Sequence, residues 1–494
     1  MNNMNLNNYD VSVIHDEKLK YPEFPYAPVE NYPELKIREL NKENNLYPKL
    51  RELFFSLGLD KENFGTKEWN PFRDLIKPGQ TALIKPNWVR DYNPIDENID
   101  SLITHTSIIR VVLDYLIIAM KGSGIIKIAD APVQDCDFQN LCKINNIQLL
   151  IDNIKKTNPE IEFKIIDLRK TILKRSNTKG SFTGKEYQVE ADGDPQGYSL
   201  IDLRQKSTLT DIDRYFKKYR ITCYDHRLLK KHHNPKKHEY FLSNSILQAD
   251  AIINIPKLKT HVKAGLTGAL KNFIGANGHK EYLPHHINGS PENGGDQYIH
   301  KNFIKTAYNL INDHYWSRLN KQNKKFSEYE FKILKFLYGT SCRFGKDNLF
   351  EGNWYGNKTV PRTTLDINNI IYFYNLNKKR LEKTPVRQVL NIVDGIIAGE
   401  ENGPLQPRAK GIGVIIAGFN PLIVDSIIGK LIGYDIDAIK TLRIGHTHKN
   451  LNFLNAEIDM DTMHVFYNNQ PFILSNLPNF DFIKPLHWNA ISID

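Results

Sequence analysis

The segment HTSIIRVVLDYLIIAMKGSGIIKIAD (residues 105–130) decides the fold class. Its first part has apolar residues at the spacing of one helix face: Ile108, Val112, Tyr115 and Ile118. This spacing predicts a helix that ends near Gly122, since glycine commonly follows a last helical turn. The run IIKIAD (125–130) predicts a strand, because it is short, β-rich and ends in a polar residue.

Further apolar runs extend this pattern on both sides. TALIKPNWV (81–89) predicts a strand that stops at Pro86, because the residue before a proline is pushed toward extended geometry. Three more strands are predicted at AIINIP (251–256), VLNIVD (389–394) and GVIIAGF (413–419). PLIVDSIIGKLIGY (421–434) predicts another helix. This alternation favours an α/β fold with a mostly parallel sheet, flanking helices and inserted segments that form a second lobe.

We therefore divide the chain into core pieces and inserted segments. The predicted core comprises an α/β segment at 81–134, a basic and glycine-rich motif at 246–280, and a C-terminal part at 386–494. The remaining ranges are an N-terminal extension at 1–80, an insertion or second lobe at 135–245 and a helical insertion at 281–385.

The composition indicates a folded protein with a moderate positive charge. Of the 494 residues 40% are hydrophobic, and 66 Lys and Arg residues outnumber 56 Asp and Glu residues, which gives a net charge of +10. This excess favours anionic partners, although a solvated basic surface would also produce it. The N-terminus lacks the pattern of a secretion signal, and no stretch reaches the ~18 apolar residues of a membrane span. We therefore expect a cytoplasmic protein.

The four cysteines are scattered along the chain, at Cys136, Cys142, Cys223 and Cys342. No two of them form a C-x2-C pair, which argues against a structural zinc site and against an iron–sulfur cluster. Reduced thiols are the simplest expectation.

Polar residues stand at the carboxyl ends of four predicted strands. They are Lys85 and Asn87, Asp130, Asn254 and Lys257, and Asp394. Ligands of open α/β sheets bind outside such strand ends. A single polar strand end is usually a turn or a helix cap, but four ends at one edge of a sheet predict a shared cleft.

The stretch PKLKTHVKAGLTGALKNFIGANGHK (256–280) predicts the basic side of that cleft. An extended backbone would place every second residue on one face, since side chains alternate with a period of two. These residues are Lys257, Lys259, His261 and Lys263. Like charges this close repel one another unless an anion or water neutralises them. The alternative is a solvated basic face with a structural histidine.

The part LTGALKNFIG (266–275) predicts a helix that follows the basic strand. Its first turn would offer free N–H groups and a partial positive charge to an anion. The candidate ligand-binding residues in it are Thr267, Gly268, Lys271 and Asn272. The glycine loop after it carries Lys280, His279, His285 and His286, which suits a lid or a second set of ligands.

Three carboxylates, Asp394, Glu400 and Glu401, stand among small residues in IVDGIIAGEENGPLQPRAKG (392–411). They could bind a divalent cation that bridges to an anionic ligand, or act as acid and base. They could equally pair with the lysines of the basic strand.

A second basic tract, HRLLKKHHNPKKHEY (226–240), is rich in histidine. Nucleic-acid or membrane-surface binding is conceivable for such a tract. We expect a mobile solvated loop instead, because the tract is isolated in the sequence.

Several of these motifs, in their order, resemble the pattern of the domain of unknown function 362 (DUF362) family. The central motif is INIPKLKTHVKAGLTGALKNFIG, and ALIKPNWV, IADAP and VDGIIAGEENGP match others. GNWYGNKTVPRTTLDIN (352–368) resembles a further motif and adds Arg362 to the ligand-binding candidates. Many members of the family carry an appended ferredoxin-like segment with clustered cysteines, which this sequence lacks. The resemblance therefore implies the core fold, but neither a defined activity nor an iron–sulfur cluster here.

We expect an enzyme that acts on a small anionic metabolite, phosphorylated or carboxylated. The candidate catalytic residues are Asp130, His261, Asp394 and Glu400. The candidate ligand-binding residues are Lys85, Asn87, Lys257, Lys259, Thr267, Gly268, Lys271, Asn272, Lys280 and Arg362. His105 is a further candidate, with a helix N-terminal cap as its alternative role.

Two other classes of function remain open. One is a non-catalytic binding or assembly protein with a basic cleft, and the other, which we rank lower, is a nucleic-acid-binding protein. A divalent metal is the cofactor that the carboxylates leave open. The sequence defines neither the reaction nor the oligomeric state.

Overall fold

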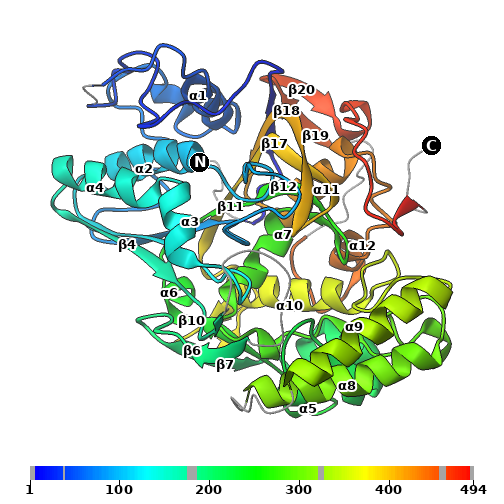
Figure 1. The fold of residues 1–494 in the computed structure, drawn as a ribbon. Helices are drawn as coiled ribbons and strands as arrows, with labels where there is room; N and C mark the ends of the chain where they lie inside the picture. Colours follow the sequence, from blue (N-terminus) through cyan, green and yellow to red (C-terminus); the bar gives the residue numbers. More distant parts are fainter. Residues whose placement is uncertain (1–5, 37–38, 175–185, 321–326, 455–462, 490–494) are drawn as a thin grey trace.

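The centre of the molecule is a large mixed β-sheet (Figure 1). The structure, a computed structural model, describes residues 6–36, 39–174, 186–320, 327–454 and 463–489. In sheet order the strands are β20 (Gln470–Ile473), β19 (His464–Tyr467), β1 (Val11–His15), β18 (Gln406–Gly418), β17 (Gln388–Asn402), β11 (Ala251–Ile255), β2 (Thr81–Pro86), β3 (Gly124–Asp130) and β4 (Ile161–Asp167). Strands β17, β11, β2, β3 and β4 pair in parallel, whereas β18 pairs antiparallel with both β17 and β1.

Two more strands continue the sheet beyond β11. Strand β12 (Lys257–His261) pairs in parallel with the second half of β17, and β13 (Gly265–Thr267) folds back on β12 as an antiparallel hairpin. Pro256 separates β11 from β12, and the two strands lie along the same partner because β17 is 15 residues long.

Helices cover both faces of the sheet. On one face are α1 (Leu46–Ser56), α2 (Thr106–Met120), α3 (Phe138–Ile144) and α4 (Ile147–Thr157), and on the other are α7 (Ala269–Asn272), α10 (Thr359–Phe373), α11 (Pro421–Leu431) and α12 (Lys440–Thr447). Successive residues of a strand point to opposite faces of the sheet and so belong to two different hydrophobic cores. Leu83 packs in the core beneath α7, α10, α11 and α12, whereas Ile84 packs in the core beneath α1 to α4. The predicted α/β fold with a mostly parallel sheet and flanking helices is confirmed.

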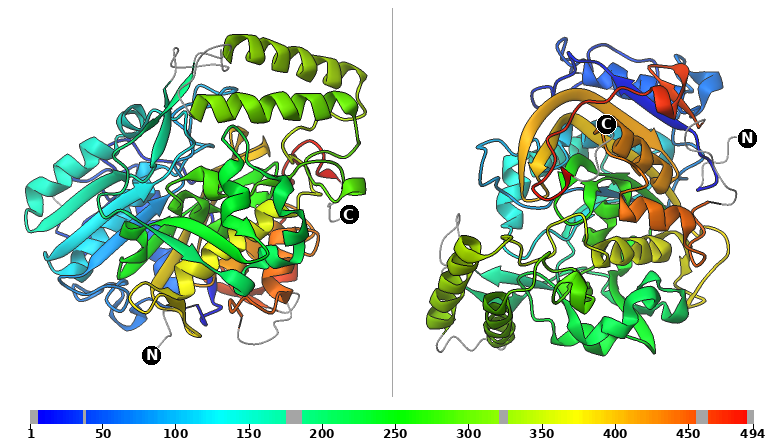
Figure 2. Two further views of the ribbon diagram at one scale, coloured as in Figure 1. Left: turned by 90° about the horizontal axis from the view of Figure 1, so that it is seen from below. Right: turned by 90° about the vertical axis from the view of Figure 1, so that its right-hand side faces the viewer.

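The remaining elements form smaller sheets and helices below the large sheet in Figure 1. The small sheets contain β5 (Thr171–Lys174) with β6 (Tyr187–Glu190), β7 (Tyr198–Asp202) with β10 (Lys237–Ser243) and β9 (His233–Asn234), β8 (Tyr219–Arg220) with β14 (His286–Ile287), and β15 (Tyr374–Asn375) with β16 (Arg380–Leu381). The short helices here are α5 (Arg227–His232) and α6 (Asn244–Leu247). Two 18-residue helices, α8 (Phe303–Asn320) and α9 (Ser327–Phe344), lie side by side at the periphery (Figure 2).

Most of the predicted core elements are present, with longer strands than expected. The runs at 81–89, 125–130 and 251–256 form β2, β3 and β11, and β2 includes Pro86 as its last residue. The two later strands are parts of the long antiparallel pair β17 and β18. Strands β1 and β4 also join this sheet, although the sequence placed residues 1–80 and 135–245 outside the core.

Two expectations about local structure are wrong. The predicted helix at 266–275 is instead β13, the four-residue α7 and a 3-10 turn, because residues 265–267 hydrogen bond to β12. The tract 226–240 is not a solvated loop. It forms α5, β9 and the start of β10, with His232, His233 and His238 all buried.

Candidate functional site

The strand ends meet in register at one edge of the sheet. Asn254 on β11 lies opposite Lys85 on β2, and on its other side it lies opposite Asn391 on β17. Lys257 on β12 lies opposite Asp394, also on β17. The structure therefore brings together residues that are up to about three hundred positions apart in the sequence.

Lys257 and Asp394 form an ion pair that is completely buried. The Lys257 Nζ lies 2.9 Å from the Asp394 Oδ2, and neither side chain is exposed. The Tyr21 hydroxyl donates to the Asp394 Oδ1 at 2.6 Å and accepts from the Lys257 Nζ at 2.6 Å. The backbone N–H of His105 adds a hydrogen bond to the Asp394 Oδ2. Burial lowers the pKa of Lys257, and Asp394 opposes that shift.

Two residues of this group have roles that the sequence did not settle. Tyr21 comes from the N-terminal segment and was not predicted, since no motif marks it. The His105 ring caps α2 by accepting a hydrogen bond from the Ser107 N–H. His105 therefore has the role of a helix N-terminal cap, which was the alternative predicted for it. Its ring stacks on Tyr21 with centroids 3.9 Å apart, and burial lowers its pKa to about 4.

Lys85 and Asp130 form a second buried ion pair. The Lys85 Nζ lies 2.6 Å from the Asp130 Oδ1, and the backbone N–H groups of Trp88 and Ala131 also donate to this carboxylate. A Cβ at Gly275 would lie 2.1 Å from the Asp130 Oδ1, so a larger residue there would displace the pair. Both charges of the pair are thus satisfied within the protein.

A chain of amides runs between the strand ends that carry these two ion pairs. Asn87 donates to Asn272, Asn272 donates to Asn254, and Asn254 donates to Asn391, each over 2.8–2.9 Å. Each of these side chains donates amide hydrogens to neighbouring groups. These hydrogen bonds fix the ends of the strands relative to α7.

A group of four lysines behind the ion pairs lacks comparable partners. We call Lys259, Lys263, Lys271 and Lys280 the lysine cluster. Among the described residues the Lys259 Nζ donates only to the Leu102 carbonyl, and the Lys280 Nζ donates only to the carbonyls of Ile274 and Asn277. The Lys271 side chain makes no hydrogen bond or ion pair with any residue that the structure describes.

The environment of the lysine cluster disfavours its positive charges. Burial and the neighbouring Lys280, Lys263 and Lys85 lower the pKa of Lys271 to about 7. Burial lowers the pKa of Lys280 to about 7 as well, and the pKa of Lys259 falls well below its usual value. Lys263 is the exception with a carboxylate within reach, at 3.8 Å from the Glu351 Oε2.

His261 lies on β12 among these lysines. Its Nδ1 accepts hydrogen bonds from the backbone N–H groups of Lys263 and Ala264. Burial, followed by Lys271 and the other lysines, lowers its pKa well below the usual value, so the ring is neutral. The alternative of a solvated basic face is wrong for these residues, because Lys257 and Lys259 are fully buried and His261 is 5% exposed.

The predicted anion site at a helix N-terminus is filled by a carboxylate of the protein. The Asp425 side chain accepts hydrogen bonds from the backbone N–H groups of Ala269 and Leu270, at 2.6 and 3.0 Å. A Cβ at Gly268 would lie 2.1 Å from the Asp425 Oδ1, which explains the glycine. Thr267 is buried, and its hydroxyl has no hydrogen-bond partner in the structure. Gly268 and Thr267 therefore border Asp425 rather than a free helix end.

Two predicted site residues have their partners elsewhere. Glu400 accepts a hydrogen bond from the Ile483 N–H and pairs with Lys410 at 3.2 Å. Arg362 on α10 donates to the carbonyls of Thr208 and Lys358 and pairs with Asp211. The carboxylates of β17 thus do not converge on one point. Among the described residues no three His, Cys, Asp or Glu side chains are grouped as metal ligands, so the divalent cation stays a prediction.

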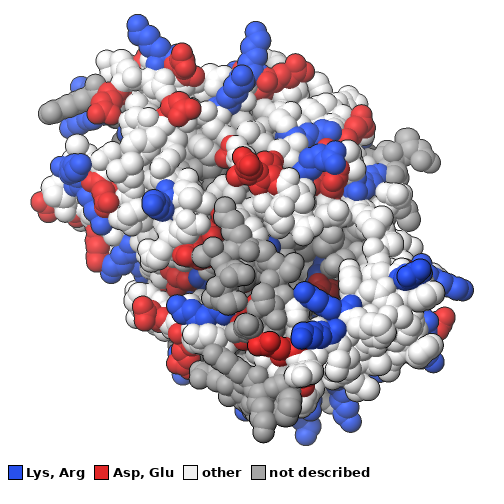
Figure 3. All heavy atoms as spheres, in the orientation of Figure 1, with Lys and Arg blue, Asp and Glu red and all other residues white. Residues whose placement is uncertain are grey.

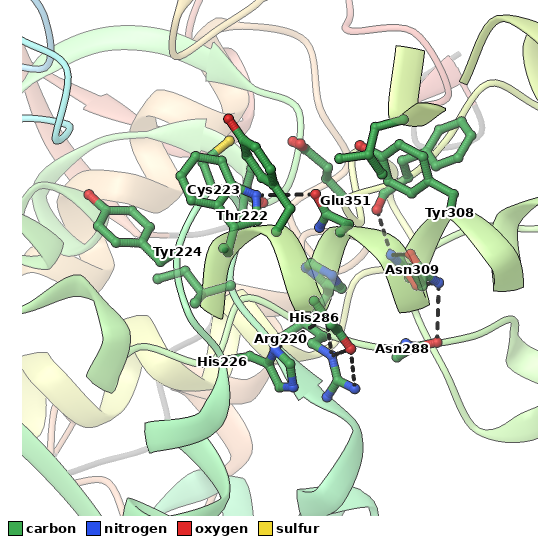
Figure 4. A pocket seen from close by; sticks show the side chains of 18 of the residues that line it. Arg220, Thr222, Cys223, Tyr224, His226, His286, Asn288, Tyr308, Asn309 and Glu351 are labelled. Carbon is green, nitrogen blue, oxygen red and sulfur yellow. Dashed lines mark hydrogen bonds and ion pairs between the residues drawn. The ribbon is translucent and has the colours of Figure 1, made fainter. Parts of the chain in front are cut away.

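A cavity of about 300 Å³ has Thr222, His286 and Glu351 in its walls (Figure 4). It borders the lysine cluster at Lys263. The Lys263 Nζ lies 2.5 Å from the Thr222 Oγ1, and both Thr222 and Glu351 line the cavity. Its other walls come from α8, α9 and the segments around Arg220 and His286. The sequence indicated His286 as a possible ligand, Cys223 as a reduced thiol and His226 as part of a basic tract. It did not indicate the aromatic residues, because aromatic residues on amphipathic helices are usually core residues.

Basic and acidic side chains of the described residues are mixed on the molecular surface and form no large patch of one sign on the face drawn in Figure 3. On the face drawn in Figure 3, lysine and arginine side chains are interspersed with acidic ones. None of the helices in the described ranges has the length and apolar character needed to cross a membrane.

Comparisons with known proteins identify one family and one distant structural relative. Residues 193–430 match the profile of a family described as a domain of unknown function, DUF362. No curated protein matches the sequence. Among solved structures, the chain is similar to the crystal structure of a protein from Thermotoga maritima, with 11% identity and a TM-score of 0.29. The alignment covers 78% of this chain and 56% of that chain, so this chain spans about half the length of the solved relative.

Proposed function

Through residues 193–430 the chain belongs to the DUF362 family, and from that premise we propose that it is an enzyme acting on a small anionic metabolite, phosphorylated or carboxylated. The lysine cluster would hold the anionic group of this metabolite. The two buried ion pairs and the amide chain would keep the cluster in position.

One observation carries the proposal: Lys271 has no partner among the described residues and lies among other lysines. Bringing like charges together in a poorly solvated site costs free energy, and an anion placed between them would offset that cost. Within the cluster, a carboxylate approaches only Lys263, and only at 3.8 Å. A bound phosphate or carboxylate would supply the missing negative charge.

The same lysines could also move protons. A group whose pKa lies near 7 exchanges its proton readily at neutral pH, which suits general acid or base catalysis. Burial holds the pKa of both Lys271 and Lys280 at about 7. When an anion binds, it favours the ammonium form, so Lys271 would become protonated and could donate to a reacting oxygen. Asp130, Asp394 and His261 would act as positioning residues for this step.

Binding is tested by calorimetric titration of inorganic phosphate and of acetate into the wild-type protein and into Lys271→Met. We expect at least one anion to bind, and the variant to bind it about ten- to a hundredfold more weakly. The control is Lys67→Met, since the Lys67 side chain is 80% exposed. Equal binding by all three proteins, or binding of neither anion, would contradict the proposal.

Catalysis needs a separate measurement. The protein is incubated with a pool of phosphorylated and carboxylated metabolites, and the pool is followed by mass spectrometry. Turnover that disappears in Lys271→Met supports an enzyme. Anion binding without any turnover would instead assign the cleft to a non-catalytic binding protein.

A further inference from the structure

The aromatic cavity next to Lys263 has no role in holding the anionic group. We infer that it receives a ring carried by the same ligand, so that the substrate class is an aromatic or heteroaromatic phosphate or carboxylate. This inference rests on the proposed function, because it assumes that the lysine cluster holds the anion.

The walls of the cavity suit a planar ring. They include Tyr224, Tyr308, Tyr315, Trp316, Tyr338 and Phe350. Aromatic side chains stack on or pack edge to face with other rings, which stabilises a complex beyond the burial of area alone. A volume of about 300 Å³ is at the lower end for sites that bind organic molecules, so it fits a small ring system.

The cavity wall also contains a buried polar atom that a ligand could hydrogen bond. His286 is 3% exposed, and its Nδ1 has no hydrogen-bond partner in the structure. A buried polar atom without a partner costs free energy that a hydrogen-bonding group on the ring would recover. Lys263 connects the two halves of the proposed site, since it contacts Thr222 of the cavity and belongs to the lysine cluster.

The test compares anions with and without a ring: inorganic phosphate with phenyl phosphate, and acetate with phenylacetate. We expect the ring to strengthen binding about tenfold, because burying it removes apolar area from water. In Tyr338→Ala this gain should shrink severalfold, with binding of the ringless anion unchanged. The matched control is Tyr329→Ala, a tyrosine on the same helix that does not line the cavity.

The outcomes separate the two proposals. Equal affinities for ringed and ringless anions would overturn the inference and leave the proposed function standing. A ring preference that Tyr338→Ala does not reduce would also overturn it. Binding of none of the four anions would refute the proposed function itself. Tyr338 is 47% exposed, so its replacement should leave folding intact, as thermal unfolding of both variants checks.

A separate observation concerns the outer side of α8 and α9. Large apolar side chains are strongly exposed there: Phe303 by 83%, Leu310 by 69%, Tyr329 by 68%, Ile333 by 45%, Phe336 by 70% and Phe344 by 74%. Such a concentration on two adjacent helices indicates an interaction surface rather than scattered exposure.

On α9 these residues form one stripe. At about 100° per residue, Tyr329, Ile333, Phe336 and Phe344 fall within an arc of about 80°. Leu334 and Tyr338 point to the opposite side, toward the helix pair and the cavity. Tyr338 on that side is also 47% exposed, so the stripe is the most exposed apolar face of α9 but not its only exposed one.

The charges beside this stripe suggest what covers it. Two exposed cations, Lys332 and Arg343, lie next to the stripe on α9, whereas Lys335 lines the cavity on the other side of the helix. Glu328 is an exposed carboxylate of the same helix. We propose that the stripe docks on an anionic lipid surface, where apolar and aromatic side chains enter the interface and cations meet lipid headgroups. A second copy of the chain would instead bring like charges together.

The docking proposal is tested by sedimentation with vesicles of phosphatidylcholine alone and of phosphatidylcholine with phosphatidylglycerol. We expect binding to the anionic vesicles only, and its loss in the double variant Phe336→Gln with Phe344→Gln. The matched control is Ile95→Gln with Leu486→Gln, since these exposed residues lie outside the two helices. Failure of the wild-type protein to bind anionic vesicles would overturn the proposal. So would a dimer in solution that the Phe336→Gln and Phe344→Gln changes dissociate.

Discussion

Two sets of lysines lie at the same end of the sheet, and they differ in what balances their charge. Lys257 and Lys85 each have a buried carboxylate, at 2.9 and 2.6 Å. Lys271 and Lys280 have no carboxylate within ion-pair distance among the described residues. Lys257 and Lys85 are fully buried, whereas Lys271 and Lys280 are partly exposed, so the two sets differ in their contact with water as well as in their carboxylate partners.

This difference separates structural charges from charges available to a ligand. A buried ion pair with additional hydrogen bonds is complete, and removal of either partner leaves an uncompensated charge. An unpaired lysine ammonium has no counter-charge. The folded protein becomes more stable when a ligand supplies that counter-charge or when the lysine loses its proton. Variants in the two sets should therefore respond in opposite directions.

The largest effect is expected for Asp394→Asn. The change leaves the Lys257 ammonium buried without a counter-charge, which should lower the free energy of unfolding by about 3–5 kcal/mol. Urea denaturation at pH 7 measures this loss. The double variant Asp394→Asn with Lys257→Met should recover much of it, because no buried charge remains. A single variant as stable as the wild type would show that Lys257 has another partner.

The next effect is a pH dependence that comes from the unpaired set. Lys271 and Lys280 have folded-state pKa values of about 7, below the usual value of 10.5. Above pH 7 the unfolded chain therefore binds more protons than the folded protein, and stability without ligand should rise with pH. Each lysine contributes at most about 1.4 kcal/mol per pH unit between pH 7 and 9, so we expect a slope of at most about 2.7 kcal/mol per pH unit for the two.

The variant Lys271→Met checks the origin of that slope. It should be more stable than the wild type at pH 7 and should show a smaller increase toward pH 9. An unchanged slope would assign the pH dependence to other groups. Chemical denaturation at the two pH values, without added phosphate, gives both numbers.

A third effect concerns affinity for the anion. Only the ammonium form of Lys271 or Lys280 attracts an anion, so binding should weaken as pH rises above 7. For one titrating lysine the loss approaches about tenfold per pH unit. Titration of phosphate or acetate at pH 7, 8 and 9 measures it, and Lys271→Met should have a flatter profile. Affinity that does not depend on pH would place the anion away from these lysines.

The sequence predicted the core elements of this fold because their signals are local. The helix α2 and the strands β2, β3 and β11 each occupy one short apolar run with clear ends. Strand β17 was predicted only in part, because GIIAGEEN continues the strand through small and charged residues. The helix at 266–275 failed because the pairing of β13 with β12 outweighs helical spacing over so short a stretch.

The candidate site was predictable in its location but not in its pairing. Polar strand ends in a parallel sheet have to meet, so Lys85, Asp130, Lys257 and Asp394 could be grouped from the sequence. Which charges neutralise one another depends on distant contacts, such as Tyr21 on Asp394 and Asp425 on the start of α7. No periodicity in the chain encodes contacts between segments that fold together from opposite ends of the sequence.

The smallest effect is expected for Glu400→Gln. The sequence groups Glu400 with Asp394 on one strand, but the structure gives it Lys410 and the Ile483 N–H as partners. Lys410 is partly exposed, so loss of the pair should change stability by only about 0–1 kcal/mol. Anion affinity should stay within about twofold of the wild type, since among the described residues no hydrogen bond or ion pair joins Glu400 to the lysine cluster. One result would contradict this prediction: turnover that Glu400→Gln abolishes while folding and anion binding persist. Glu400 would then reach the reacting atoms. The contrast between paired and unpaired charges would in that case not define the active residues.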